Sequence, residues 1–194
     1  MSHKLKVVAV SGNLQRPSRT LVLVEQLLAA LGDVVPIEMQ LIELGDIGPQ
    51  FAGTLYRSQL PAAVEAQVAA IESADLLLVA SPVYRGSYTG LLKHLFDFVH
   101  HEALTDKPVL LAATGGSDRH ALVIDHQLRS LFSFFQALTL PIGVYAVEKD
   151  FDGYEIASPA LRARIALAAE RAVPHLRDIA PAARGKSAPV ALAA

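Results

Sequence analysis

Two amino-acid types are missing from this 194-residue chain, which has no cysteine and no tryptophan. Without cysteine the protein has no disulfides, thiolate zinc sites, iron–sulfur ligands or thiol nucleophile. Aromatic residues of all kinds amount to only 6% of the chain. Any redox chemistry would therefore depend on a bound cofactor rather than on the chain's own sulfur.

An excess of one charge and a long hydrophobic run are also missing. Lys and Arg total 17 against 19 for Asp and Glu, which argues against binding to a polyanion and predicts no nucleic-acid partner. The first apolar run, residues 7–10, ends at once in Ser11-Gly12-Asn13. This run is too short for a secretory signal or for a membrane span of about 20 residues. We expect a cytoplasmic protein that does not bind membranes.

What the chain does have is a series of short apolar runs that alternate with stretches of helical periodicity. Its 52% hydrophobic content is enough for a core that is covered on both faces. The pattern predicts strands at 6–10, 37–42, 76–81, 108–113 and 142–147, and helices at 18–31, 61–74, 89–100, 119–138 and 158–178. This alternation predicts a three-layer α/β sandwich of the flavodoxin-like type, with a five-stranded parallel sheet in the order 2-1-3-4-5.

We expect one domain over residues 1–180 and a disordered tail over 181–194, because the tail is rich in Pro, Ala, Gly and Ser. The longest connections are 45–59 and 148–157. The second strand has the half-exposed pattern of a sheet edge. In this fold a ligand binds at the carboxyl ends of strands 1, 3 and 4.

The loop after the first strand, residues 11–20, reads SGNLQRPSRT and runs directly into a helix. A phosphate monoester fits such a loop, because free backbone N–H groups, the positive end of a helix dipole, three hydroxyls and two guanidiniums converge there. Taken alone, the loop is equally consistent with an ordinary capped helix start. It matches neither the P-loop nor the Rossmann glycine pattern.

The loop after the third strand reads SPVYRGSYTG over residues 81–90. A Pro-x-Tyr turn at the end of a strand offers rigid backbone donors and a flat aromatic surface, which suits a planar ring system. The alternative is that Tyr84 and Tyr88 only pack at the rim of the sheet, while Lys93 and Asp97 form a surface ion pair on the next helix.

The loop after the fourth strand reads ATGGSDRH over residues 113–120. Two adjacent glycines allow the backbone to approach a planar ligand without a Cβ in the way. A plain Gly-Gly turn is the alternative. Because all three unusual loops follow the strands at the expected ligand site, we predict that they form one site together.

At these residues the sequence resembles the NADPH-dependent FMN reductase family over nearly the whole chain. Within that family it is most similar to the reductase components of two-component alkanesulfonate and methanesulfonate monooxygenases. The likeness lies in Gly12 with 17–20, in 81–84 with 90–93, and in 112–117 with His120. Many relatives have Gly-Ser where this chain has Gly12-Asn13.

The resemblance implies an NAD(P)H:FMN oxidoreductase, with residues 1–180 as its FMN-binding domain, that supplies reduced FMN to a flavin-dependent monooxygenase in sulfonate sulfur assimilation. FMN would carry out hydride transfer from NADPH or NADH, so no catalytic side chain and no metal ligand is predicted. The first loop would hold the FMN phosphate and the other two loops the isoalloxazine. Arg16 and Arg85 are also candidates for contacting the extra phosphate of NADPH. The predicted cofactor-binding residues are Ser11, Asn13, Arg16, Ser18, Arg19, Thr20, Pro82, Val83, Tyr84, Arg85, Gly86, Thr114, Gly115, Gly116 and Ser117.

The resemblance also implies a helical bulge at the position of His126, at an oligomer interface, where relatives of the alkanesulfonate system have a tyrosine. The periodicity of residues 124–135 instead predicts an unbroken α-helix. A histidine with no catalytic task is the simpler interpretation of His126.

Other functions remain open from the sequence. A quinone or azo reductase could use the same scaffold. A flavodoxin-type electron carrier is a non-enzyme alternative, although such carriers tend to be strongly acidic and to enclose the flavin between aromatic rings. A flavin-free regulatory protein is a third.

We expect a homodimer or a tetramer. Apolar residues on the helices at 89–100 and 119–138 offer more apolar surface than one face of the sheet readily covers.

Overall fold

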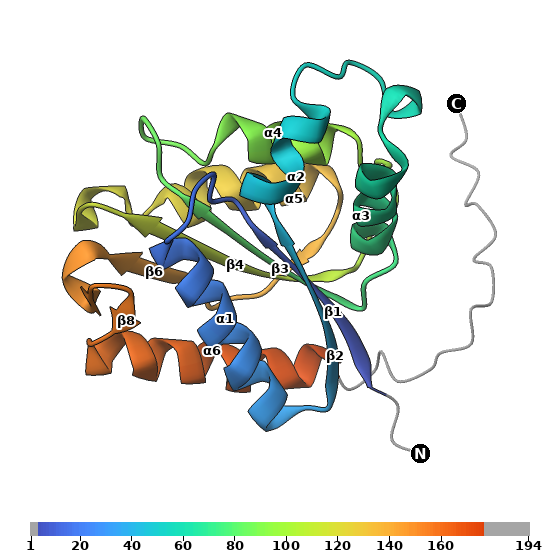
Figure 1. The fold of residues 1–194 in the computed structure, drawn as a ribbon. Coiled ribbons are helices and arrows are strands. Elements are labelled where there is room, and N and C mark those ends of the chain that lie inside the picture. The colour runs from blue at the N-terminus through green and yellow to red at the C-terminus, as the bar shows by residue number, and fades with distance from the viewer. Residues whose placement is uncertain (1–3, 177–194) are drawn as a thin grey trace.

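The computed structural model describes residues 4–176. They form a three-layer sandwich, with a parallel sheet between two layers of helices (Figure 1). The predicted tail at 181–194 lies outside the described residues, and so do the last two residues of the final predicted helix.

The sheet has the predicted strand order. β2 (Ile37–Glu43) lies at one edge, followed by β1 (Leu5–Ser11), β3 (Leu76–Pro82) and β4 (Pro108–Gly115), all parallel. Every residue of β3 is buried, whereas β2 is partly exposed, as its polar residues predicted. The flavodoxin-like fold and the order 2-1-3-4-5 are thus confirmed.

The fifth position of the sheet is occupied by two short strands instead of the single strand predicted at 142–147. Both β5 (Leu138–Thr139) and β6 (Val144–Val147) pair with β4 in parallel. Pro141 lies between them and has no N–H to donate to a ladder. The Arg129 guanidinium binds the carbonyls of Leu140 and Pro141 at 2.9 and 3.0 Å. The interruption is therefore held by a side chain from a neighbouring helix.

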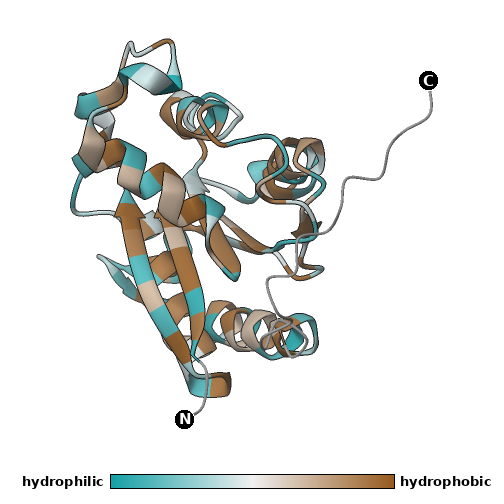
Figure 2. Cartoon of the chain, turned by 90° about the vertical axis from the view of Figure 1, so that its right-hand side faces the viewer, coloured by the Kyte–Doolittle hydropathy of each residue, from teal (hydrophilic) through white to brown (hydrophobic). Residues whose placement is uncertain are grey.

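Helices cover both faces of the sheet (Figures 1 and 2). α1 (Arg19–Val34) and α6 (Pro159–Leu176) cover one face, while α3 (Ala62–Glu72), α4 (Gly90–Asp97) and α5 (Arg129–Phe134) cover the other. The apolar residues of each layer form a separate core on their own side of the sheet. No helix in the described part of the chain is long and apolar enough to cross a membrane.

A short helix, α2 (Leu44–Phe51), stands where the sequence predicted a loop at 45–59. It contains two glycines and a proline, which disfavour helix by themselves. Leu44 and Phe51 are nevertheless fully buried against the α3–α5 side of the sheet. Burial of these two side chains overrides the local preference.

The unbroken α-helix predicted at 119–138 is wrong. A π-helix (Ile124–Leu128) precedes α5, so the bulge implied by the resemblance is present and contains His126. Ile124 and Leu128 are both buried on the sheet, which explains why their spacing looked α-helical. α5 ends at Phe134 because Gln136 has a φ of 54°, a left-handed conformation that stops a helix.

The second predicted loop, 148–157, contains a small hairpin of β7 (Phe151–Asp152) and β8 (Glu155–Ile156). Gly153 makes the turn with a φ of 58°. The hairpin leads directly into α6 and packs against α1.

Candidate functional site

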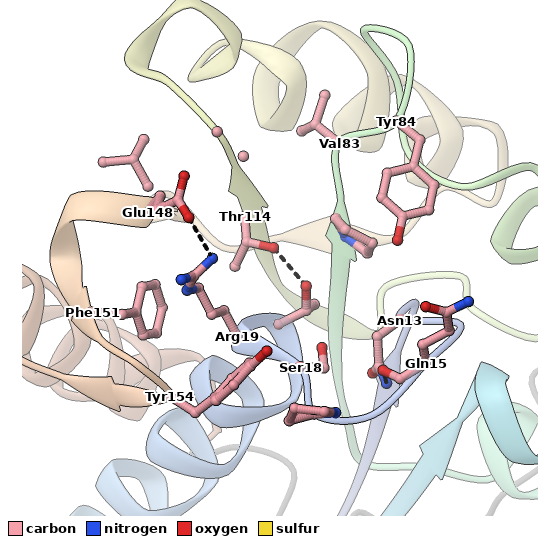
Figure 3. A pocket seen from close by; sticks show the side chains of 16 residues that line it. Asn13, Gln15, Ser18, Arg19, Val83, Tyr84, Thr114, Glu148, Phe151 and Tyr154 are labelled. Atoms are coloured by element: carbon pink, nitrogen blue, oxygen red, sulfur yellow. Dashed lines mark hydrogen bonds and ion pairs between the residues drawn. The ribbon is translucent and has the colours of Figure 1, made fainter.

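A cavity of about 280 Å³ lies at the carboxyl ends of β1, β3 and β4 (Figure 3). All three loops that the sequence singled out contribute to it, together with the hairpin that follows β6. The residues that line it are Asn13, Gln15, Pro17, Ser18, Arg19, Thr20, Pro82, Val83, Tyr84, Thr114, Gly115, Gly116, Val147, Glu148, Phe151 and Tyr154.

The first wall is the start of α1. Ser18 caps this helix, and its hydroxyl accepts a hydrogen bond from the Leu21 N–H at 3.2 Å. The N–H groups of Arg19 and Thr20 have no partner within the helix, because they belong to its first turn. That turn contains no acidic residue. The cavity therefore has the unpaired donors and positive dipole end that favour an anion.

A buried contact joins this helix to β4. The hydroxyls of Thr20 and Thr114 are 2.5 Å apart, and both side chains are almost fully buried. The contact fixes the start of α1 against the third loop. The two loops are consequently positioned as one unit.

The second wall is the loop after β3, where Pro82, Val83 and Tyr84 face the cavity. The Val83 N–H donates to the Thr114 carbonyl at 2.8 Å. Beyond them the chain reverses in a tight turn, with φ values of 54° at Arg85 and 81° at Gly86. Both central residues of a type I′ turn have positive φ. The turn takes these two residues away from the cavity.

The π-helix holds this turn in place. The Gln127 side chain donates to the Gly86 carbonyl at 2.9 Å and accepts from the Ser87 hydroxyl. The bulge in the helix thus supports the loop that borders the cavity.

The third wall is the Gly-Gly loop after β4. A Cβ at Gly115 would collide with the hydroxyl of Tyr145, which donates to the Ser117 carbonyl at 2.7 Å. Burial, with a smaller contribution from Asp118, raises the pKa of Tyr145, so its phenol stays protonated as a donor. A Cβ at Gly116, in contrast, would meet no protein atom within 4 Å. Gly116 borders open space that a flat ligand can occupy.

The fourth wall, residues 147–154, was not predicted from the sequence. It contributes Val147, Glu148, Phe151 and Tyr154. Two signals could have found it: the loop follows the carboxyl end of the fifth strand, and Asp152-Gly153 between two aromatic residues is typical of a hairpin turn. Gln15 and Pro17 were also missed, although they lie within the first loop.

Ten of the fifteen predicted residues line the cavity and five do not. Ser11 is buried beneath it and donates to Asn13. Arg85 and Gly86 form the turn described above. Ser117 lies just beyond Gly116, outside the lining.

Arg16 is the fifth residue outside the lining, because its guanidinium turns away to Glu43 at the end of β2. Its Nε donates to Glu43 at 2.9 Å, and a second donor of the same guanidinium completes the pair. The Glu43 carboxylate is buried and raises the pKa of Arg16 through this hydrogen bond and its charge. Arg16 therefore neutralises a buried acid next to the first loop.

The arrangement fits a phosphate-bearing planar ligand. The helix start supplies donors for the anion, and the open space at Gly116 suits a flat ring. The one group of three metal-ligating side chains found within residues 4–176, His100–Glu102, is exposed and lies outside this cavity.

The comparison with known families decides which ligand of this kind is relevant. Residues 5–152 match the family model described as NADPH-dependent FMN reductase. The chain belongs to the NADPH-dependent FMN reductase family. The matched range includes all three predicted loops and the first part of the fourth wall, so the whole cavity except Tyr154 falls within it.

Curated relatives are similar over almost their full length. The chain is 65% identical over 183 residues to the NADH-dependent FMN reductase SfnF of Pseudomonas fluorescens strain Pf0-1, covering 92% of this chain and 98% of that protein. It is 66% identical over 174 residues to an FMN reductase (NADPH) of Pseudomonas aeruginosa strain PAO1, covering 90% and 94%.

A solved structure of the same kind has a similar fold. The apo form of the NADH:FMN oxidoreductase EmoB superposes with a TM-score of 0.78 at 30% identity, covering 93% of this chain and 92% of that one.

Proposed function

We propose that this protein reduces FMN with electrons from a reduced nicotinamide and passes the reduced flavin to a flavin-dependent monooxygenase. The observation that carries the proposal is the convergence of three loops on one cavity, with unpaired helix donors at one wall and open space above a glycine at another. Family membership adds the identity of the flavin.

The residues of the cavity have separate tasks in this proposal. The first turn of α1 and the side chains of Ser18 and Arg19 would bind the FMN phosphate. Pro82–Tyr84 and Thr114–Gly116 would hold the isoalloxazine from two sides and exclude water from it. FMN, when bound, supplies hydride transfer chemistry, so the protein needs to orient two ligands rather than provide an acid or a base.

The relatives differ in the nicotinamide that is named as their electron donor. Two relatives of almost equal identity are named for different donors, NADH in one and NADPH in the other. Of the two arginines predicted to contact the extra phosphate of NADPH, Arg16 is paired with Glu43. That pairing favours use of NADH as well as NADPH.

The relative named SfnF also favours a role beside a partner enzyme. We infer that the partner is a monooxygenase acting on an alkanesulfonate or methanesulfonate, and that both proteins work in the cytoplasm. The balanced charge of the chain is consistent with a free reductase rather than a strongly acidic electron carrier.

The test is oxidation of NADPH and of NADH by the purified protein, with and without added FMN. FMN-dependent oxidation of either nicotinamide supports the reductase. Tight FMN binding without turnover would favour the electron carrier, and turnover only with a quinone or an azo dye would favour the other reductases.

A substitution in the cavity tests whether the activity depends on this site. Gly116→Val should leave the fold intact, because the added Cβ meets no protein atom within 4 Å and the side chain starts into open space. The same side chain occupies the space assigned to the flavin ring, so FMN binding and FMN-dependent turnover should both fall at least tenfold. Unchanged turnover in a folded Gly116→Val protein would place the flavin elsewhere.

We also propose that the protein is a homodimer or tetramer assembled through α4 and the π-helix–α5 segment. Most of the apolar residues predicted to be in excess on these helices are in fact buried in the core. What remains is a groove of about 790 Å³ between the two segments, bordered by Phe134 with a relative exposure of 68%. A monomer at micromolar concentration in sedimentation would refute the assembly, and Phe134→Asp should weaken it.

A further inference from the structure

The fourth wall of the cavity is tied to the rest of the site by two ion pairs. On one side Lys149 Nζ lies 2.7 Å from Asp118 Oδ2, within the Gly-Gly loop after β4. On the other side Glu148 Oε1 lies 3.0 Å from Arg19 Nη1, at the start of α1 (Figure 3). The wall thus bridges the phosphate-binding end and the ring-binding end of the cavity.

Arg19 has three contacts with this wall and remains accessible. Besides Glu148, its Nε donates to the Gly153 carbonyl at 3.2 Å, and its guanidinium lies 5.7 Å from the centre of the Tyr154 ring. A guanidinium has five N–H donors in one plane. These contacts therefore leave donors of Arg19 that a phosphate in the cavity can reach.

Glu148 introduces a negative charge where a dianionic phosphate is expected. It contacts the same guanidinium that would bind the phosphate, and two anions sharing one cation repel each other. Its side chain has a relative exposure of 65%. Because water screens an exposed carboxylate, the repulsion weakens phosphate binding without preventing it.

We propose that Glu148 competes with the flavin phosphate for Arg19 and thereby limits how tightly the protein holds FMN. The inference rests on the proposed function, in which reduced flavin must leave the protein to reach a second enzyme. Because Glu148 weakens phosphate binding without preventing it, Arg19 still recognises the phosphate and FMN can still dissociate. Glu148 is thus a specificity-determining residue that acts on the phosphate and not on the ring.

The direction of the effect follows from what remains when the charge is removed. In Glu148→Gln, an amide oxygen can still accept a hydrogen bond from Arg19, while Gly153 and Tyr154 continue to position the guanidinium. The substitution removes the ion pair with Arg19, with which the phosphate competes, and the repulsion between the carboxylate and the phosphate. An exposed ion pair is worth about 0.2–1 kcal/mol, which corresponds to a change in affinity of roughly 1.4- to fivefold.

The experiment measures dissociation constants of FMN and of riboflavin, which lacks the phosphate, by quenching of flavin fluorescence. Glu148→Gln should bind FMN roughly 1.4- to fivefold more tightly at low salt, with riboflavin affinity unchanged. The gain should shrink at high ionic strength. Release of FMN should slow by a similar factor.

Asp118→Asn is the matched control. It also converts a carboxylate to an amide, breaks the other ion pair of the same wall, and has a similarly exposed side chain of 73%, but Asp118 makes no contact with Arg19. It should leave both affinities unchanged. An equal gain in Asp118→Asn would mean that net charge, and not competition for Arg19, sets the affinity, which would overturn the proposal.

The remaining outcomes separate this inference from the proposed function. If the wild-type protein binds both flavins and Glu148→Gln fails to tighten FMN, or tightens riboflavin equally, the competition is refuted and the reductase function stands. If the wild-type protein binds neither flavin, the proposed function itself fails and the competition falls with it.

Discussion

Replacing Gly12 with alanine tests how the first loop is positioned over the sheet. Gly12 lies where the chain leaves β1 and crosses the end of β3, and its N–H donates to the Ala80 carbonyl at 2.7 Å. A Cβ at Gly12 would lie 3.0 Å from that carbonyl oxygen and 3.2 Å from the Cα of Ser81. Both are backbone atoms of a fully buried strand, so neither can move freely.

The expected cost follows from these distances. Overpacking of a close-packed region costs typically 1–3 kcal/mol, and contacts that must open by only a few tenths of an ångström place Gly12→Ala in the lower half, about 1–2 kcal/mol. For a domain of this size, 1 kcal/mol lowers Tm by about 2–4 °C, so a decrease of roughly 2–8 °C is expected. FMN affinity should fall too, because the phosphate loop is displaced.

The assay is urea and thermal unfolding of the flavin-free protein, with Gly116→Ala as the control. A Cβ at Gly116 meets nothing within 4 Å, so its stability should stay within about 0.5 kcal/mol of wild type. If Gly12→Ala unfolds at the same urea concentration as Gly116→Ala, the loop is not held by close packing against β3 and the reasoning is refuted.

Of two further predictions, one concerns the stability of the fold and the other the support around the site. Burial by itself would raise the pKa of Glu72. Hydrogen bonds from Arg57 and from the His100 N–H, together with the Arg57 charge, instead lower this pKa below its ordinary value. The contribution of Glu72 to stability is therefore present above the unfolded pKa and is lost as pH falls through the folded pKa. The Glu72→Gln protein should be less stable than wild type at neutral pH, and it should lose less stability than wild type between about pH 5 and pH 3. Urea unfolding at a series of pH values measures both effects, and parallel pH profiles of the two proteins would contradict this reasoning. Gln127→Ala removes two hydrogen bonds to the turn after β3, each worth about 0.5–1.5 kcal/mol. The turn borders the cavity without lining it, so we expect a loss of affinity equal to about one of these bonds: both FMN and riboflavin should bind roughly two- to tenfold more weakly. A loss confined to FMN would show that the turn does not support the ring.

Much of this protein could be predicted from its sequence because the determining signals are local. Runs of apolar residues separated by helical periodicity define parallel strands and their crossovers, and the handedness of such crossovers leaves few possible orders for the sheet. The first loop was recognisable because its hydroxyls and arginines stand directly before a helix.

Other features were decided only by contacts between distant segments. The interruption of the fifth strand depends on Arg129 binding the carbonyls near Pro141, and α2 depends on the burial of Phe51. The π-helix has a periodicity that resembles an α-helix, because both geometries place Ile124 and Leu128 on the sheet.

The two arginines of the first loop also show what the local sequence determines and what only the tertiary contacts decide. The sequence placed Arg16 and Arg19 in one phosphate-binding loop, and by composition they are equivalent. In the folded protein Arg16 turns to the buried Glu43 of β2, whereas Arg19 lines the cavity and contacts Glu148. The position of two carboxylates, supplied by segments 27 and 129 residues away from their arginines along the chain, determines which guanidinium is left to meet a ligand. Pairing of this kind depends on where the strands end in space, and only the tertiary structure decides it.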